Sequence, residues 1–359
     1  MKKIVTILGA RPQFVKAAVL SRIIQNDNKI EEVIVHTGQH FDKNMSAIFF
    51  DEMNIPQAKY NLDINSMSHG AMTGLMLKDI EEVLNEEKPN AVVVYGDTNS
   101  TIAGALAAKK MGIQVVHIEA GLRSFNMSMP EEINRILTDR ISDLLCCPTD
   151  AAIENLGKEG FDNLPNKVVK CGDIMKDAVE YYSLISESKS NIIESLHLTS
   201  EKFILATVHR QENTDDISRL TSIFEALEEI NKEVNVVLPL HPRTQNVLKK
   251  QNLNYKITFI DPVGYFDMLE LLKNCELVMT DSGGLQKEAF FSKKPCVILR
   301  DETEWVELVQ YEFAELVGAD KPKILEAVNT LKDVEFDFSK ELFGNKVGER
   351  IYNEILTVL

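Results

Sequence analysis

Short runs of consecutive apolar residues alternate along the chain with longer stretches in which apolar residues recur at helical spacing. Runs such as residues 4–8 and 91–95 predict strands that are buried on both faces. Between Met72 and Leu84 the apolar positions follow the period of an amphipathic helix. Because strands and helices alternate almost throughout, the chain is predicted to be an α/β protein with parallel sheets covered by helices on both faces.

The predicted elements fall into two similar halves. Strands are predicted at residues 4–8, 33–37, 91–95, 114–118, 144–147 and 167–171, then at 203–208, 235–240, 257–260 and 296–299, with a further strand starting at Leu277. Helices are predicted near 42–53, 72–84, 217–230 and 324–331, at 347–359, and from Pro130, where two acidic residues follow the proline. A chain of 359 residues exceeds what one core usually supports, so we expect domains at 1–171 and 172–346, with helix 347–359 free to pack back on the first.

Composition and charge narrow the class of protein. Hydrophobic content of 44% and charged content of 26% are typical of soluble globular proteins. No apolar run approaches the ~20 residues of a membrane span, and Gly9 and Arg11 come too early for a secretory signal, so a cytoplasmic location is predicted. A net charge of −16 disfavours nucleic acid and anionic membranes as partners. The five cysteines lack Cys-x-x-Cys spacing, which predicts buried reduced thiols and no metal site.

Polar residues follow several of the predicted strands. Ligands of open parallel sheets bind beyond the carboxyl ends of the strands. The residues expected there are Arg11, Asp97, Glu119 and Glu131 in the first half, and His209, His241, Ser282 and Glu288 in the second. We therefore predict a cleft between two domains, with carboxylates on one side and phosphate-binding groups on the other.

Taken one at a time, several of these polar residues also fit purely structural roles. Asp97 could cap the helix that begins near Thr98, and Glu131 could complement a helix dipole. His36 and His117 lie inside apolar strands, which favours a structural role in the core over a role in the site.

The stretch after the strand at Leu277 has the features of a phosphate site. Gly283 and Gly284 let a ligand approach the backbone, and the predicted helix presents unpaired N–H groups and the positive end of its dipole. Ser282 adds a hydroxyl, and the Glu288 carboxylate suits the two hydroxyls of a ribose. The alternative is an ordinary strand-to-helix turn with a solvent-exposed Glu288.

Short motifs occur in a fixed order along the chain. They are Gly9-Ala10-Arg11-Pro12 with Lys16, Tyr95-Gly96-Asp97-Thr98, His117-Ile118-Glu119-Ala120-Gly121-Leu122-Arg123, Pro130-Glu131-Glu132-x-Asn134-Arg135, His209-Arg210-x-Glu212-Asn213, and Asp281-Ser282-Gly283-Gly284 with Gln286 and Glu288. Together they resemble the non-hydrolysing UDP-N-acetylglucosamine 2-epimerases over about the whole chain.

The resemblance implies a glycosyltransferase-B-like fold of two Rossmann-like domains, and a homodimer. It implies reversible inversion at C2 of a UDP-linked 2-acetamido sugar for cell-surface polysaccharide synthesis, with no nicotinamide, other cofactor or metal. Carried over by position, it implies catalytic roles for Asp97, Glu119, Glu131 and His209, and UDP contacts for Arg11, Lys16, Arg135, Ser282, Gly283, Gly284 and Glu288. His241, at the end of a predicted strand, is expected to be a further UDP contact.

Parts of the chain are similar to one branch of that family. Residues 9–14, 36–42, 124–126 with 129–130, and 303–307 resemble enzymes that epimerise UDP-2,3-diacetamido-2,3-dideoxyglucuronate. Trp305 stands where many bacterial enzymes for the simpler sugar carry arginine. Both substrates therefore stay open: UDP-N-acetylglucosamine, converted to UDP-N-acetylmannosamine, and the diacetamido uronate. Phe41 after Gln39-His40 departs from the pattern of relatives that a second UDP-N-acetylglucosamine activates, so we predict no need for a priming sugar.

The chemistry at C2 explains why several carboxylates are needed. The C2 proton is not acidified by a carbonyl group, so its removal requires UDP to leave C1 at the same time, giving a 2-acetamidoglucal. Inversion then needs acid and base groups on both faces of one carbon, which three carboxylates can supply. A glycosyltransferase with a UDP-sugar donor, a hydrolysing epimerase and a non-catalytic sensor are the competing hypotheses.

Overall fold

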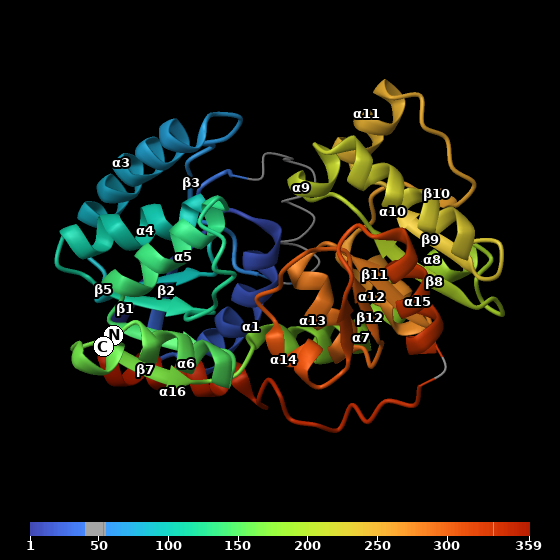
Figure 1. Cartoon of the computed structure of the whole chain (residues 1–359). Helices are drawn as coiled ribbons and strands as arrows, with labels where there is room; N and C mark the ends of the chain where they lie inside the picture. Colours follow the sequence, from blue (N-terminus) through green and yellow to red (C-terminus); the bar gives the residue numbers. More distant parts are fainter. Residues whose placement is uncertain (40–52, 54, 333) are drawn as a thin grey trace. The chain divides into compact units, whose positions relative to one another are not determined.

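The computed structural model describes residues 1–39, 53, 55–332 and 334–359 (Figure 1). It divides into two compact units, the first made of Met1–Ala178 and Glu341–Leu359 and the second of Val179–Lys340. The first unit therefore extends past the expected boundary at 171 and takes up the chain again at Glu341. The helix predicted near 42–53 lies outside the described residues, and the cleft expected between the two halves stays a prediction.

Within the described part of the first unit, seven parallel strands form one sheet in the order β3-β2-β1-β4-β5-β6-β7. They are β1 Lys2–Leu8, β2 Ile30–His36, β3 Tyr60–Asn61, β4 Ala91–Tyr95, β5 Gln114–Ile118, β6 Leu144–Cys147 and β7 Lys167–Lys170. The helices are α1 Arg11–Asp27, α3 His69–Glu87, α4 Asn99–Lys110, α5 Pro130–Ile141, α6 Asp150–Lys158, α16 Val347–Val358 and a 3-10 turn, η1, at Phe161–Asn163. Apolar side chains of β1, β2 and β4 form one core with the inner faces of α3 and α4.

Within the described part of the second unit, six parallel strands follow the order β10-β9-β8-β11-β12-β13. They are β8 Phe203–Thr207, β9 Asn235–Pro239, β10 Thr258–Ile260, β11 Leu277–Thr280, β12 Cys296–Ile298 and β13 Ala314–Leu316. The helices are α8 Ile192–Ser195, α9 Gln211–Thr214, α10 Ile217–Ile230, α11 Pro242–Lys250, α12 Tyr265–Asn274, α13 Gly283–Phe291, α14 Val306–Gln310 and α15 Lys321–Lys332, while α7, Ile174–Lys189, crosses the division between the units. Residues of α10 and α15 pack with β8, β9 and β11 in one core.

Both sheets share one topology, which fixes where a ligand site can lie. In each sheet the chain builds outward from its first strand and then crosses to the other side, at β1/β4 in the first unit and β8/β11 in the second. Loops that leave such a reversal point diverge and open a crevice at the carboxyl ends of the strands. The loops after β1, β4, β8 and β11 carry the motifs that begin at Gly9, Gly96, His209 and Asp281.

The alternating pattern predicted strands well and missed short elements. Several predicted strands run one residue too long, yet these residues still pair: Thr37 donates its N–H to Leu8 and Leu299 donates to Thr280. The pattern missed β3 and β13, which are two and three residues long, and the helices α6, α7, α8, α9, α11, α12 and α14. All five cysteines, each in the described part of the chain, are buried and carry free thiols, as predicted. Among the described helices, none has the length and apolarity to cross a membrane.

The last helix returns to the first unit. Helix α16 packs against α1, and the Tyr352 hydroxyl donates a hydrogen bond of 2.6 Å to the Asp27 carboxylate. A Cβ on Gly348 would lie only 2.7 Å from Val19 and Ile23, so glycine allows this close approach. The Asp173 N–H donates to the Phe343 carbonyl at 2.9 Å. This hydrogen bond joins the segment that leaves the first unit to the segment that returns to it.

Candidate active site

The loop after β1 is tied to the loop after β4 by one buried amide. Gln13 accepts hydrogen bonds from Gly9 N–H at 2.8 Å and Ala10 N–H at 3.0 Å, and its side-chain N–H donates to the Tyr95 carbonyl at 2.8 Å. A Cβ on Gly9 would lie 2.0 Å from the Ser100 hydroxyl, so only glycine fits. Sequence reasoning missed Gln13, whose only signal is a polar residue among the apolar positions of α1.

Arg11 and Lys16 stand on this same helix. Arg11 is the first residue of α1 and half-buried, whereas Lys16 is buried and reaches the loop after β5.

The side chain of Gln39 accepts from both the backbone N–H and the hydroxyl of Ser100. His40 and Phe41, on which the expectation about a priming sugar depends, lie outside the described residues.

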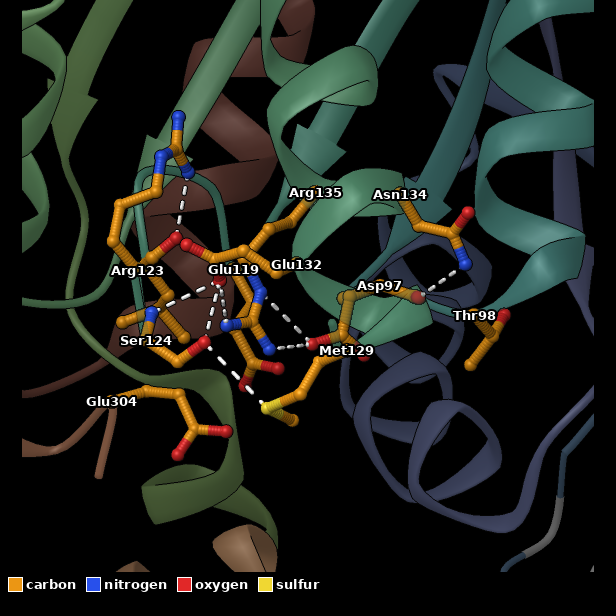
Figure 2. Close-up of polar contacts among 12 residues, drawn as sticks. Asp97, Thr98, Glu119, Arg123, Ser124, Met129, Glu132, Asn134, Arg135 and Glu304 are labelled. Atoms are coloured by element: carbon orange, nitrogen blue, oxygen red, sulfur yellow. Dashed lines mark hydrogen bonds and ion pairs between the residues drawn. The ribbon is translucent and has the colours of Figure 1, made fainter. Parts of the chain in front are cut away.

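Asp97 is held by a chain of alternating charges (Figure 2). Arg135 donates to the Asp97 carboxylate from Nε at 3.2 Å and from Nη2, and its Nη1 donates to Glu132 at 2.7 Å. Glu132 is completely buried and also accepts from the Ser124 N–H and hydroxyl and from the Phe125 N–H. This network fixes the position of the Asp97 carboxylate, which stays partly exposed.

The structure bears on the simpler interpretations of Asp97 and Glu131. Thr98 is the N-cap of α4 and its side chain accepts from the Thr101 N–H, so the interpretation of Asp97 as that cap is wrong. Glu131 lies half-buried in the first turn of α5, where a dipole role and a role in catalysis both fit. Arg135, predicted to contact UDP, is bound to two carboxylates of its own unit, and its contact with UDP stays a prediction.

Glu119 follows β5 with an unusual backbone conformation. Its φ is +71°, in the left-handed region that non-glycine residues rarely occupy and that often marks a functional position. The Lys16 ammonium lies 2.5 Å from its carboxylate, and a Cβ on Gly96 would lie 3.3 Å from the same carboxylate. The strands β4 and β5 thus bring Glu119 beside the turn that carries Asp97.

The two histidines of the apolar strands are buried, as predicted. His36 is 7% exposed, its ring stacks on Phe14 with centroids 5.2 Å apart, and Nδ1 lies 3.2 Å from the Asn61 side-chain oxygen. His117 is wholly buried, and both of its ring nitrogens lie at hydrogen-bond distance from oxygen atoms.

In the second unit, a buried carboxylate organises the loop after β8. Asp281 accepts hydrogen bonds from the backbone N–H groups of His209 and Arg210, both at 2.9 Å, and from the Asn213 side chain at 3.1 Å. The His209 side chain remains 36% exposed, and its ring centroid lies 5.5 Å from that of His241. His241 is the N-cap of α11 and accepts from the Arg243 N–H.

The double glycine forms the start of a helix, as predicted. Ser282 is the N-cap of α13, with its hydroxyl oxygen 3.5 Å from the Leu285 N–H, and Gly283 and Gly284 are the first helical residues. Glu288 is 9% exposed, so the interpretation as an ordinary turn with a solvent-exposed glutamate is wrong in that respect. Free N–H groups at a helix start are suited to an anion.

Two arginines that sequence reasoning missed lie beside this helix start. A Cβ on Gly283 would lie 3.7 Å from Arg210 Nη2, 3.8 Å from Arg300 Nη1 and 3.6 Å from Oε1 of Glu304, the carboxylate that pairs with Arg300. Arg300 is completely buried and donates to Glu304 at 2.8 Å, while within the described chain its Nε and Nη2 form no hydrogen bond. Burial raises the pKa of the Glu212 carboxyl, and the nearby Arg300 and Arg210 guanidiniums reduce that rise. Cations in this position strengthen an anion site.

The two units therefore gather different sets of predicted residues. The first brings together Asp97, Glu119, Lys16 and Arg135, with Arg11 and Glu131 on helices that start at the same sheet edge. The second brings together His209, His241, Ser282, Gly283, Gly284 and Glu288 at the edge formed by β8, β9 and β11. Among the described residues, no group of three His, Cys, Asp or Glu side chains is arranged to hold a metal ion.

Comparison with known proteins gives consistent matches. The family model described as UDP-N-acetylglucosamine 2-epimerase matches residues 22–356. The UDP-2,3-diacetamido-2,3-dideoxy-D-glucuronate 2-epimerase of Pseudomonas aeruginosa is 54% identical over 95% of this chain and 96% of its own. The crystal structure of the Methanocaldococcus jannaschii UDP-GlcNAc 2-epimerase in complex with UDP-GlcNAc and UDP has a TM-score of 0.91 and 45% identity, and covers 99% of both chains. The Neisseria meningitidis enzyme bound to UDP-GlcNAc has a TM-score of 0.88 and 29% identity, again over 99% of both chains.

Proposed function

Because the chain belongs to the UDP-N-acetylglucosamine 2-epimerase family, we propose that it interconverts UDP-N-acetylglucosamine and UDP-N-acetylmannosamine by inverting C2. The fold is the glycosyltransferase-B-like one of the family's solved structures. One observation supports the catalytic part of the proposal most directly. Asp97 and Glu119 stand at the ends of neighbouring strands, and each is paired with a buried cation from a helix.

The proposed reaction is an elimination followed by re-addition. A carboxylate removes the proton from C2, the C1–O bond breaks, and UDP leaves with that electron pair, giving a bound 2-acetamidoglucal. A carboxylic acid on the other face then returns a proton to C2 while a UDP oxygen attacks C1. Asp97, Glu119 and Glu131 are the groups proposed to carry these protons.

The negative charge that grows on the departing diphosphate must be stabilised by cations and hydrogen-bond donors. Arg11, Lys16 and His209 are proposed to stabilise it together with the N-terminus of α13 at Ser282, Gly283 and Gly284. Glu288 is proposed to bind the ribose hydroxyls, with His241 and Arg135 as further contacts of the ligand. All of these residues except His241 lie in the motifs that resemble the family's, and His241 is included because it follows a strand of the same sheet.

A second substrate is favoured by one comparison. The relative from Pseudomonas aeruginosa, at 54% identity, is named for UDP-2,3-diacetamido-2,3-dideoxy-D-glucuronate. Trp305, at a position where many enzymes for the simpler sugar carry arginine, is buried and lies 4.2 Å from the Lys287 ammonium, measured to the ring centroid. The same chemistry at C2 would serve both sugars.

The test is to incubate the protein with each UDP-sugar in D₂O and to follow the sugar by NMR. We expect the C2 epimer with UDP still attached, deuterium at C2, and traces of UDP and 2-acetamidoglucal after long incubation. Whichever UDP-sugar gives the higher kcat/KM is the substrate. Release of the free sugar would indicate a hydrolysing enzyme, and transfer of the sugar to an acceptor would indicate a glycosyltransferase. A sugar that stays unchanged would indicate a binding protein.

We also propose a cytoplasmic homodimer. Five buried free thiols fit a reducing compartment. Ile133 and Leu137, 42% and 50% exposed, lie one turn apart on α5 and offer an apolar surface to a second copy. Analytical ultracentrifugation of the wild type and of Leu137→Lys tests the dimer, which we expect the substitution to weaken.

A further inference from the structure

A buried histidine joins the two turns that carry Asp97 and Glu119. His117 is the fourth residue of β5 and its side chain is wholly buried. Its Nε2 lies 2.7 Å from the carbonyl oxygen of Gly96, and its Nδ1 lies 2.7 Å from Asp139 Oδ1 on α5. Each ring nitrogen therefore faces an oxygen, and the question is which atoms carry the protons.

The carbonyl oxygen of Gly96 can only accept, so Nε2 must carry a proton. The other partner is a carboxylate that is itself held in its charged form. Asp139 Oδ2 accepts from the Gly121 N–H at 3.1 Å and from Arg123 Nη1 at 2.7 Å. The Arg123 guanidinium is always charged, and its hydrogen bond holds the Asp139 carboxyl in its ionised form. Asp139 Oδ1 is therefore an acceptor as well, and Nδ1 must donate to it.

A neutral imidazole has a proton on one nitrogen only. We propose that His117 is an imidazolium, protonated on both nitrogens, and that this buried cation is a positioning residue that holds the Gly96–Asp97 turn and the Glu119–Gly121 turn in register for catalysis. The proposal rests on the proposed function in so far as Asp97 and Glu119 act on the sugar. The protonation state of the ring does not depend on that function.

The charges around His117 balance in this form. Arg123 is buried and also binds Glu159, the C-cap residue of α6, through Nε and Nη2. Cys147 on β6 adds no charge, because burial and the Asp139 carboxylate raise the pKa of its thiol well above the usual value. The two cations His117 and Arg123 thus face the two carboxylates Asp139 and Glu159. Buried ions persist where each is paired and hydrogen-bonded in this way.

The cluster of His117, Asp139, Arg123 and Glu159 contacts residues that neighbour the proposed catalytic carboxylates. Gly96 has a φ of +61° and immediately precedes Asp97, so its carbonyl is the anchor of that turn. Gly121, with a φ of +81°, lies two residues after Glu119, and its N–H is bound by Asp139. A neutral His117 protonated on Nδ1 would present a lone pair to the Gly96 carbonyl and repel it. The imidazolium is the form that binds the Gly96 carbonyl and, at the same time, Asp139, which in turn binds the Gly121 N–H.

The first test measures the ring directly in the wild-type protein. Two-bond ¹H–¹⁵N correlation NMR of ¹⁵N-histidine-labelled protein at pH 8, where an ordinary histidine is neutral, should show one histidine with both nitrogens protonated. The spectrum of His117→Asn assigns that signal by its disappearance. If instead every histidine in the spectrum shows one protonated and one bare nitrogen, the proposed imidazolium is wrong, whether or not the protein is an epimerase.

The second test separates positioning from stability. In His117→Gln the amide N–H can replace Nε2 toward Gly96, whereas in His117→Asn the shorter amide reaches only toward Asp139. We expect kcat to fall about 10- to 100-fold in His117→Asn, with KM little changed, and to recover in large part in His117→Gln. His36→Asn is the matched control, a buried strand histidine exchanged in the same way, and should keep kcat.

The outcomes of the second test are distinct. If kcat follows the melting temperature across all three variants, or if His117→Asn keeps a normal kcat, the positioning role is wrong. Should the variants not fold, deuterium uptake at C2 by wild-type protein decides the proposed function and the ring spectrum decides the imidazolium. A failure of the proposed function would leave no C2 exchange in any variant, which differs from a loss confined to His117→Asn.

Discussion

The carboxyl edges of the two sheets have one topology and opposite chemistry. In the first unit, the carboxyl ends of β4 and β5 present the Asp97 and Glu119 carboxylates, and each carboxylate is held by a cation. In the second unit, the reversal point between β8 and β11 presents donors. There the carboxylate of Asp281 is completely buried and binds backbone N–H groups, while Arg300 lies against the start of α13.

The difference shows what the fold decides and what the residues decide. The fold places loops at the same edge in both units, because the chain reverses direction at the same point of each sheet. We expect the residue types on those loops to decide whether an edge transfers protons or binds an anion. We therefore expect substitutions of the first unit's carboxylates to lower kcat, and substitutions at the start of α13 in the second unit to weaken UDP binding.

The largest expected effect is in the first unit. Asp97→Asn, Glu119→Gln and Glu131→Gln keep the shape of each side chain and remove its charge, so each should lower kcat about 10²- to 10⁴-fold while UDP binding is largely kept. Steady-state kinetics and calorimetry with UDP measure the two quantities. Asp143→Asn is the matched control, since Asp143 binds Lys109 and the Val115 N–H near the start of β5 and should leave kcat unchanged. A variant of the three with near-normal turnover would mark that carboxylate as structural.

The next effect should be a loss of affinity in the second unit. Arg300→Met removes a cation beside Gly283, and we expect the Kd of UDP to rise about 10- to 100-fold, because a hydrogen bond to a charged group contributes ~1.5–3 kcal/mol. The substitution also removes the ion pairs of Arg300 with Glu304 at 2.8 Å and with Glu212 at 3.5 Å. The double variant Arg300→Met with Glu304→Gln corrects for this loss. If the double variant binds UDP as the wild type does, Arg300 serves only to neutralise the carboxylates of Glu304 and Glu212 and contributes nothing to the anion site.

Smaller losses of affinity are expected at the helix start itself. Ser282→Ala removes the N-cap of α13, and Glu288→Gln removes a charge predicted to bind the ribose, so each should weaken UDP about fivefold, which corresponds to ~1 kcal/mol. At saturating substrate kcat should stay close to normal for both. A large fall of kcat with unchanged Kd would contradict the division of roles between the two units.

A cluster of charges at Glu87 lies away from the carboxyl edges of both sheets. Its ion pairs are expected to stabilise the fold without affecting catalysis. Glu87, on α3, accepts from Lys3 at 2.8 Å, from Lys59 and from Tyr60 at 2.7 Å, which lowers the pKa of its carboxyl to about 2. Because the folded pKa lies below the ordinary 4.5, this stabilisation is present above pH 4.5 and is lost as the pH falls toward 2. Glu87→Gln should lower the free energy of unfolding by about 1–3 kcal/mol at pH 7.

Urea unfolding at several pH values measures this effect. The difference in stability between the variant and the wild type should shrink between pH 4.5 and pH 2, and kcat at pH 7 should be unchanged. A difference that is constant with pH would mean that the cluster acts by packing and not by charge.

Local patterns of the sequence determine many of the strands and helices and the places of several site residues. The apolar runs determined the strands β4, β5 and β6 to the residue, and the helical period determined α10, since burial on both faces or on one face requires these periods. The positions of Asp97, Glu119 and Ser282 after strands followed from the same pattern. A cap and a double glycine likewise act over a few residues, which is why the start of α13 could be predicted.

Other features required the tertiary structure, because they depend on partners far apart in the sequence. Nothing local to Asp97 names Arg135 as its partner, and nothing local to Gly283 names Arg300. The sequence suggested that His117 is buried, but the form of its ring is set by Gly96 and Asp139, which the sheet and α5 bring to it. The return of α16 to the first unit depends in the same way on close packing between Gly348 and α1. Local periodicity determines which residues are buried, whereas the pairing of buried charges is decided only when the chain has folded around them.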